Sequence, residues 1–284
     1  MILNLEKKQD APAPFVDLWP RLISAIILII AALVTLRVGG KLFVLFWVLA
    51  AAAVSWEWQS LICAQRAHLR SVLGVIGCAL VAWLSWRHDV KGVFILMILA
   101  VLTLAGLAKQ GRRLWAGGGM IYAALLVAGV CFLRLSPQHG LEGIAFLFAI
   151  VWGADIFAYF GGRLIGGPKL WPAVSAGKTW SGSIVGLICG ALCGLLTIWL
   201  FSEMQLETFP TFLLGLSVAL ISQLGDLFES AVKRTFGVKD SSQLIPGHGG
   251  VMDRLDAFIF AVIYAALLGL VRSPRSVADG FFFW

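Results

Sequence analysis

The chain has 284 residues, of which 60% are hydrophobic and 13% are charged, and its mean hydropathy is +0.92. Soluble domains are about 45–50% apolar and about 25% charged. The composition therefore excludes an ordinary soluble domain and predicts an all-α, polytopic integral membrane protein. The net charge of +7 fits basic loops beside anionic lipid headgroups. Because no basic stripe is interleaved with aromatic residues, no nucleic-acid partner is expected.

Apolar runs long enough to cross a bilayer, about 17–25 residues each, predict about nine transmembrane helices. The first run has no cleavage motif close behind it, so we interpret it as a retained span rather than a signal peptide. In chain order the nine runs centre on residues 21–38, 42–58, 71–86, 92–108, 119–135, 141–161, 182–201, 211–230 and 254–271.

Basic residues predict the orientation of these spans, because Lys and Arg are enriched in cytoplasmic loops. Most of the 22 Lys and Arg residues fall on the side of the N-terminus, which predicts an inner-membrane protein with its N-terminus inside. The excess depends on the polar loops 162–181 and 231–253, without which the two sides are nearly equal. Both loops then face the cytoplasm.

Acidic residues inside or at the ends of apolar spans are costly there and usually face a polar cavity or a partner. Asp226, Glu229, Ser230 and Lys233 follow a spacing of three, four and seven residues, which places them on one helical face. The remaining acids of this kind are Glu57, Asp155, Asp253 and Asp256. Asp253 and Asp256 begin the ninth span, where a helix N-terminus favours carboxylates, so capping is one interpretation of that pair.

The segment between the last two spans combines basic side chains, hydroxyls and a glycine-rich turn, whose backbone N–H groups can approach an anion closely. Carboxylates from two helix ends suit Mg²⁺, which takes one or two carboxylates and completes its shell with phosphates and water. Together these features predict a phosphoryl- or nucleotidyl-transfer site. The candidate residues of the segment are Arg234, Lys239, Asp240, His248, Gly249, Gly250 and Arg254.

A plainer interpretation of the same residues is a salt-bridged hairpin of two spans. In that arrangement basic side chains neutralise acidic ones and bind no ligand. The neutralising residues would be Lys233, Arg234 and Arg254, and the acids would be Asp226, Glu229, Asp253 and Asp256.

A second group of candidates lies at the end of the sixth span. Asp155 and Tyr159 share a helical face that leads to Arg163 and a basic loop. The fragment Gly177-Lys178-Thr179 resembles the end of a P-loop, but Pro172 stands where the first glycine of that motif would be, so we reject it. Ser175, Lys178 and Thr179 remain candidate phosphate contacts. The alternative is a lysine that reaches the interface beside a helix-capping threonine.

The stretch 230–256 reads SAVKRTFGVKDSSQLIPGHGGVMDRLD, and it resembles the signature of the phosphatidate cytidylyltransferases, also called CDP-diglyceride synthases. The resemblance extends to residues 222–230 and 151–170, and so covers the C-terminal half. It implies that CTP and phosphatidate give CDP-diacylglycerol and pyrophosphate. It further implies Asp226, Asp253 and Asp256 around Mg²⁺, with a monovalent cation such as K⁺ as a second ion.

The resemblance also suggests roles for the basic residues and an organisation of the chain. Lys233, Arg234, Lys239, Arg163 and Lys178 would hold the pyrophosphate and the lipid phosphate, and His248 would orient a phosphate, since an ionised nucleophile needs no base. We expect residues 1–140 to form a lipid-facing wall and candidate dimer contact, residues 141–284 to form the catalytic region, and the protein to be a homodimer.

Two other functions remain open at this point. A CTP-dependent kinase of a lipid alcohol would share the nucleotide chemistry but release CDP. A secondary transporter would use Asp155 and Asp226 as ion sites, although it predicts inverted repeats that the sequence does not display.

Overall fold

The computed structural model describes residues 18–62, 67–247 and 249–283. Helices dominate this part of the chain, and one short two-stranded sheet joins the sixth helix to the seventh. The elements are α1 (Leu18–Val38), α2 (Gly40–Ile62), α3 (Ala67–Trp86), α4 (Val90–Leu107), α5 (Arg113–Arg134), α6 (Gly140–Leu164), β1 (Lys169–Trp171), β2 (Ser175–Thr179), α7 (Trp180–Phe201), α8 (Thr208–Thr235), α9 (Met252–Arg272) and α10 (Val277–Phe282).

Within the described ranges, eight helices, α2 to α9, are long and apolar enough to cross a membrane, and α1 contributes the shorter apolar stretch Leu22–Val38. The all-α, multi-pass prediction is confirmed, and the predicted number of about nine spans is close. Two elements were not expected. The β1–β2 hairpin forms inside the polar loop predicted at 162–181, and α10 is a single short helix after the last span.

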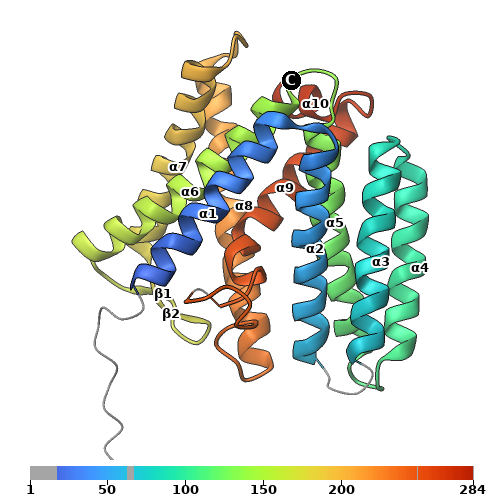
Figure 1. Cartoon of the computed structure of the whole chain (residues 1–284). Coiled ribbons are helices and arrows are strands. Elements are labelled where there is room, and N and C mark those ends of the chain that lie inside the picture. The colour runs from blue at the N-terminus through green and yellow to red at the C-terminus, as the bar shows by residue number, and fades with distance from the viewer. Residues whose placement is uncertain (1–17, 63–66, 248, 284) are drawn as a thin grey trace, which may run out of the picture.

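The helices form one bundle in which the C-terminal helices α8 and α9 lie between two groups (Figure 1). Helices α6 and α7 pack along each other on one side, and α3 and α4 lie on the other side. Helix α5 contacts α2, α3, α4 and α9, and is the most deeply enclosed of the spans. The N-terminal and C-terminal halves of the chain therefore share one core.

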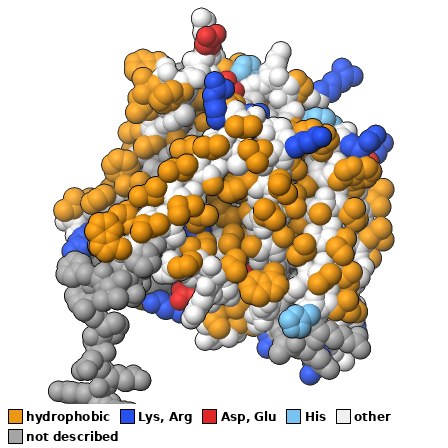
Figure 2. Space-filling model, viewed as in Figure 1, with side chains coloured by type: hydrophobic (Ala, Val, Ile, Leu, Met, Phe, Trp, Pro, Cys, Tyr) orange, Lys and Arg blue, Asp and Glu red, His pale blue; other side chains and the backbone are white. Residues whose placement is uncertain are grey.

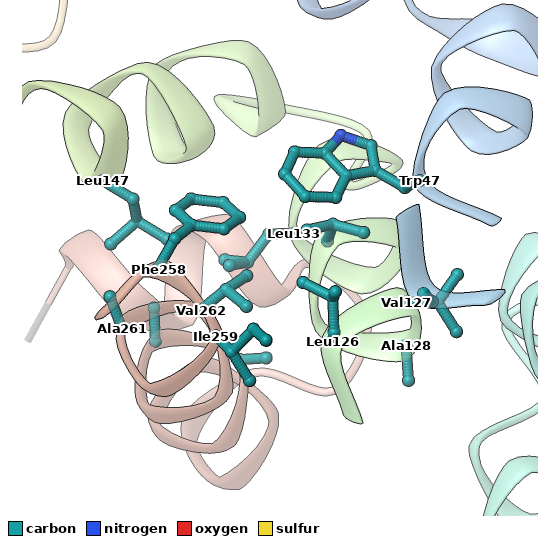
Figure 3. Packing of buried hydrophobic residues seen from close by; sticks show 14 of the residues in the cluster. Trp47, Leu126, Val127, Ala128, Leu133, Leu147, Phe258, Ile259, Ala261 and Val262 are labelled. Carbon is teal, nitrogen blue, oxygen red and sulfur yellow. The ribbon is translucent and has the colours of Figure 1, made fainter. Parts of the chain in front are cut away.

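Large apolar side chains from α2, α5 and α9 meet in this core (Figure 3). Trp47 is 1% exposed and stacks on Phe258, with ring centroids 5.0 Å apart. Leu126 and Val262 are fully buried beside them. Close packing between these side chains stabilises the helices against one another, whereas lipid tails offer similar apolar contact but no defined arrangement.

The glycines that recur every four residues along α7 face α6 of the same chain. A methyl group at Gly190 would lie 2.9 Å from both the Ala154 Cβ and the Ile150 carbonyl oxygen, and one at Gly186 would lie 2.7 Å from the Ala154 carbonyl oxygen. Small residues let two membrane helices approach this closely. The glycine ridge is therefore an intrachain contact, which holds the end of α6 beside the start of α7.

The polar connections gather at one end of the bundle. The β1–β2 hairpin, in which Lys169 pairs with Thr179 and Trp171 with Ser175, lies at the same end as the α8–α9 connection, whereas α10 lies at the opposite end. In Figure 2 hydrophobic side chains cover the middle of the visible face, and Lys and Arg side chains lie toward its two ends. This distribution is typical of a membrane-spanning bundle.

Candidate active site

A cavity of about 860 Å³ opens at the end of the bundle that carries the hairpin. Its walls come from α6, β1, β2, α7, α8 and α9. The two groups of candidates that are far apart in the sequence therefore line one space. The predicted residues in its lining are Asp155, Tyr159, Arg163, Ser175, Lys178, Thr179, Asp226, Lys233, Asp240, Asp253, Arg254 and Asp256.

Other predicted residues lie outside the described lining of the cavity. Arg234 is exposed and its Nη1 donates to the Val238 carbonyl oxygen at 3.0 Å, and Lys239 is also exposed. Ser230 is next to the lining, because its Oγ is 3.5 Å from Asp226 Oδ1. His248 lies outside the residues that the structure describes, so its predicted role stays a prediction.

The glycine-rich turn has a structural role that its composition did not reveal. Gly249 accepts a hydrogen bond from the Ile245 amide at 2.8 Å, and its positive φ of 84° is a conformation that glycine adopts readily. The Gly250 amide donates to Asp253 Oδ2 at 2.7 Å. In this structure the turn therefore points an amide at a carboxylate of its own chain.

Lys178 and Asp226 form an ion pair across the cavity, and each side chain is about one quarter exposed. Lys178 comes from β2 and Asp226 from the middle of α8. The next residue, Thr179, caps α7, because its Oγ1 accepts the Gly182 amide at 3.1 Å. The fragment Lys178-Thr179 thus combines the two interpretations of the sequence, since the threonine is a helix cap and the lysine faces the cavity.

Lys233 lies between two carboxylates at the buried side of the cavity. Its Nζ is 2.8 Å from Glu229 Oε2 and 2.7 Å from Asp253 Oδ1, and the three side chains are 12%, 0% and 5% exposed. The salt-bridge interpretation is therefore correct for Lys233, Glu229 and Asp253. It does not account for Asp226, whose partner is Lys178.

Asp253 is held by the loop that precedes α9. Its carboxylate accepts the Ser241 amide at 2.9 Å, the Ser241 hydroxyl at 2.9 Å and the Gly250 amide at 2.7 Å, besides the bond from Lys233. Charge-assisted hydrogen bonds from this many donors hold the carboxylate and the loop residues in one arrangement. Asp253 therefore organises the loop, and its predicted metal role stays a prediction.

The remaining carboxylates leave oxygens that face the cavity. Asp155, Asp226 and Asp256 are near enough to interact electrostatically with one another, and Lys178 and Arg254 act on them from the same space. In the described part of the chain, no three His, Cys, Asp or Glu side chains lie close enough together to bind a metal ion by themselves. Mg²⁺ needs only one or two protein carboxylates when phosphates complete its shell. Asp226 and Asp256 fit that requirement.

Two residues that matter to the site were not assigned to it from the sequence. Gln223 lines the cavity and links α8 to α7, donating from Nε2 to the Ser183 carbonyl oxygen at 3.0 Å and accepting from the Ser183 hydroxyl at 2.5 Å. Its position three residues before Asp226, on the same helical face, was the available signal. Glu57 of α2 contacts the loop before α9, and no local spacing connects the two segments.

Comparison with known proteins gives consistent results. Residues 19–271 match the model of the cytidylyltransferase family. The chain is 38% identical over 279 residues to a phosphatidate cytidylyltransferase of Brucella abortus, covering 94% of this chain and 98% of that protein. It is 37% identical over 278 residues to a phosphatidate cytidylyltransferase of Haemophilus influenzae, covering 85% and 95%. A phosphatidate cytidylyltransferase of Staphylococcus saprophyticus is 31% identical over 248 residues, again covering 85% and 95%.

Proposed function

This chain belongs to the cytidylyltransferase family, and on that basis we propose that it transfers the cytidylyl group of CTP to phosphatidate, giving CDP-diacylglycerol and pyrophosphate for phospholipid synthesis. One observation carries the proposal beyond family membership. The cavity at the end of an apolar bundle is lined by both carboxylates and cations, from Asp226 and Asp256 to Lys178 and Arg163. Such a lining suits a nucleoside triphosphate bound together with a divalent cation.

The proposed reaction is a displacement at the α-phosphorus of CTP. A phosphate oxygen of phosphatidate attacks the α-phosphorus of CTP, the new P–O bond forms, and the bond from that phosphorus to the bridging oxygen of the β-phosphate breaks. The electron pair leaves with pyrophosphate. Because the attacking phosphate is already ionised, no side chain has to remove a proton.

The basic residues of the lining would hold the phosphates by charge-assisted hydrogen bonds. Lys178 and Arg163 face the cavity from the hairpin and from the end of α6, and Lys233 and Arg254 face it from α8 and α9. Ser175, Thr179 and Tyr159 would add neutral contacts. Asp240 also lines the cavity, next to the exposed Lys239, whereas the exposed Arg234 belongs to the last turn of α8. Because Arg234 and Lys239 are exposed, we propose that they attract incoming phosphates toward the cavity and do not hold them inside it.

We propose Mg²⁺ as the cofactor, held by Asp226 and Asp256, with Asp253 as a third carboxylate nearby and a monovalent cation such as K⁺ as an additional ion. When bound, Mg²⁺ would stabilise the negative charge on the transferring cytidylyl phosphate and on the leaving pyrophosphate. Asp155 faces the same carboxylates. Its role would be to keep the local charge negative enough to attract the cation.

We further propose the inner membrane as the location, with the N-terminus and the active site on the cytoplasmic side, and a homodimer as the assembly. The excess of Lys and Arg on the side of the cavity supports the orientation. CTP then reaches the cavity from water, and phosphatidate reaches it from the adjacent leaflet. Cysteine cross-linking in membranes checks the dimer independently of activity.

The test of function is pyrophosphate release by the purified protein in mixed micelles with CTP and phosphatidate. We expect release that requires phosphatidate and Mg²⁺, stops on addition of a chelator, and is lost in Asp226→Asn. The matched control is Asp89→Asn, which replaces one helix-capping residue by an equally good one in the α3–α4 turn at the other end of the bundle.

Other outcomes identify the alternatives. Release of CDP with a lipid alcohol, and no pyrophosphate, would establish the kinase. Folded protein without nucleotide turnover that moves a solute across vesicles would establish the transporter.

A further inference from the structure

Glu57 is a fully buried carboxylate in α2, and all of its observed partners lie in the connection between α8 and α9 or at the start of α9. It accepts the Ser242 hydroxyl at 2.6 Å and the Ser241 hydroxyl at 3.2 Å. It also accepts the amides of Val251 at 2.8 Å and Met252 at 2.7 Å. A buried charge is costly unless several donors satisfy it. Here the two amides and the Ser242 hydroxyl do so, while the single hydrogen of the Ser241 hydroxyl is shared with Asp253.

The two amides are those that the start of a helix leaves without a partner. Helix α9 begins at Met252, and its N-cap residue, Val251, provides no side-chain cap in the described structure. A carboxylate at this place satisfies the amides and interacts favourably with the helix dipole. Glu57 therefore caps α9 from a different helix, and it fixes the first turn that presents Asp253, Arg254 and Asp256 to the cavity.

Glu57 is also joined to the buried ion pair through one serine. The Ser241 hydroxyl lies between Glu57 Oε2 and Asp253 Oδ2, at 3.2 Å and 2.9 Å. Asp253 in turn binds Lys233 at 2.7 Å. Ser241 therefore lies between Glu57 of α2 and the Asp253–Lys233 pair, and its one hydroxyl hydrogen can donate to either carboxylate.

The glycine at position 250 is required for this arrangement. A methyl group there would lie 2.7 Å from Glu57 Oε1 and 2.8 Å from its Cδ. These distances are shorter than any ordinary contact of a Cβ atom, and the Ser241 hydroxyl oxygen would be closer still, so any other side chain would displace Ser241, Glu57 or both. The close approach of the loop backbone to Glu57 is therefore built into the sequence.

We propose that Glu57 is a positioning residue of the active site: by capping α9 and anchoring residues 241–242 and 251–252, it sets the positions of Asp253 and Asp256. The effect on catalysis rests on the proposed function, whereas the anchoring of the loop does not. Glu57 touches neither the cavity lining nor any phosphate contact of the hairpin. Its loss should therefore reduce turnover more than nucleotide affinity.

The test compares Glu57→Gln with Gln59→Leu. Gln59 is a second fully buried polar residue of α2, and it bonds to the Ala116 carbonyl oxygen and to Arg70 rather than to the loop. The first measurement is the rate of tryptic cleavage after Lys239, with cleavage after Lys169 as the internal reference. We expect Glu57→Gln to accelerate the first cleavage about 10-fold, because a charged acceptor is lost, and Gln59→Leu to leave the ratio of the two cleavages unchanged.

The second measurement is the kinetics of pyrophosphate release. We expect kcat of Glu57→Gln to fall about 10- to 100-fold while KM for CTP changes by less than about 3-fold. In Gln59→Leu, kcat per folded molecule should remain near that of the wild type. Equal cleavage ratios in wild type and Glu57→Gln, or a loss of kcat that only follows thermal stability in both variants, would overturn the proposal.

Ser242→Ala tests the same contact from the loop side if Glu57→Gln does not fold. It removes the 2.6 Å bond and should raise cleavage after Lys239 in the same direction. In a Glu57→Gln background that folds, its effect should be smaller than in the wild type, because the contact to residue 57 is already weakened; Ser242→Ala also removes the acceptor of the Leu244 amide in both backgrounds. Absence of any increase in Ser242→Ala counts against the anchor. If the wild type releases no pyrophosphate, the proposed function fails, and the cleavage ratios still decide whether Glu57 anchors the loop.

Discussion

The Lys178 ammonium of β2 pairs with the Asp226 carboxylate of α8, and both residues line the cavity. Before a ligand binds, each charge therefore has a partner. A bound triphosphate with its cation would replace that pair by two stronger ones, with the phosphate at the lysine and the metal at the aspartate.

Replacement of Lys178 should therefore affect catalysis more than folding. We expect Lys178→Met to lower kcat/KM for CTP about 100-fold, which corresponds to roughly 3 kcal/mol of lost transition-state stabilisation. The kcat/KM of Lys178→Arg should lie between those of the wild type and Lys178→Met, because a planar guanidinium keeps the charge but does not reproduce the compact ammonium. Lys91→Met, at an exposed position at the other end of the bundle, serves as the control. Equal kcat/KM in Lys178→Met and the control would contradict the assignment.

Lys233 should be a stability determinant. Its removal leaves Glu229 and Asp253 buried without their shared cation, and breaking a buried pair costs about 3–5 kcal/mol. We expect Lys233→Met to lower the unfolding temperature strongly, whereas Arg234→Met, at an exposed neighbour, should change stability by no more than about 0.5 kcal/mol. Adding Glu229→Gln to Lys233→Met should restore part of the loss. A double variant as unstable as the sum of both changes would argue against the pairing.

The contact of α6 with α7 predicts a cost for any added side chain. Gly190→Ala places a methyl group 2.9 Å from the Ile150 carbonyl oxygen, which is backbone and cannot rotate away. Overpacking of this kind costs about 1–3 kcal/mol. Gly106→Ala in α4 meets nothing within 4 Å, and should be neutral or stabilising by up to about 1 kcal/mol. Thermal unfolding in detergent separates the two, and equal stability of both variants would refute the close contact.

Two tyrosines allow a comparison of a buried hydroxyl with a half-buried, hydrogen-bonded one. The Tyr122 hydroxyl is buried without a hydrogen-bond partner among the described residues, whereas the Tyr264 hydroxyl donates to Ser217 Oγ at 3.1 Å. Tyr122→Phe should therefore be neutral or slightly stabilising, and Tyr264→Phe should cost about 1 kcal/mol. The free energies of unfolding in a denaturant that preserves the micelle give both values. A larger loss at Tyr122 would reveal a partner for its hydroxyl.

The sequence predicted most of the bundle because the signal for a span is simple. A bilayer-length apolar run has few alternatives to a helix, so the runs 92–108 and 182–201 correspond directly to α4 and α7. The β1–β2 hairpin and α10 were not predicted. Each is only a few residues long, and neither has a periodic apolar pattern.

The site was predictable where its residues share a helix. The spacing of Glu229 and Lys233 predicts the contact found at 2.8 Å, and Asp226 and Ser230 likewise lie next to each other. The exposure of Lys239 could not be predicted, because the residues just after it, Ser241 and Ser242, bond to Glu57 of α2. The role of Glu57 was hidden for the same reason. Its partners are set by packing between helices and not by spacing along one of them.

The capping of α9 by α2 also constrains the order of events during synthesis. Glu57 precedes its partner Met252 by 195 residues, so α2 leaves the ribosome long before α9 exists. Until α9 arrives, a carboxylate at the buried end of α2 has to stay at the membrane surface or take other donors, since an isolated charge within lipid is costly. The contact of Glu57 with the start of α9 can therefore form only after α9 has been made, and a chain that ends before α9 lacks the two amides that this carboxylate accepts.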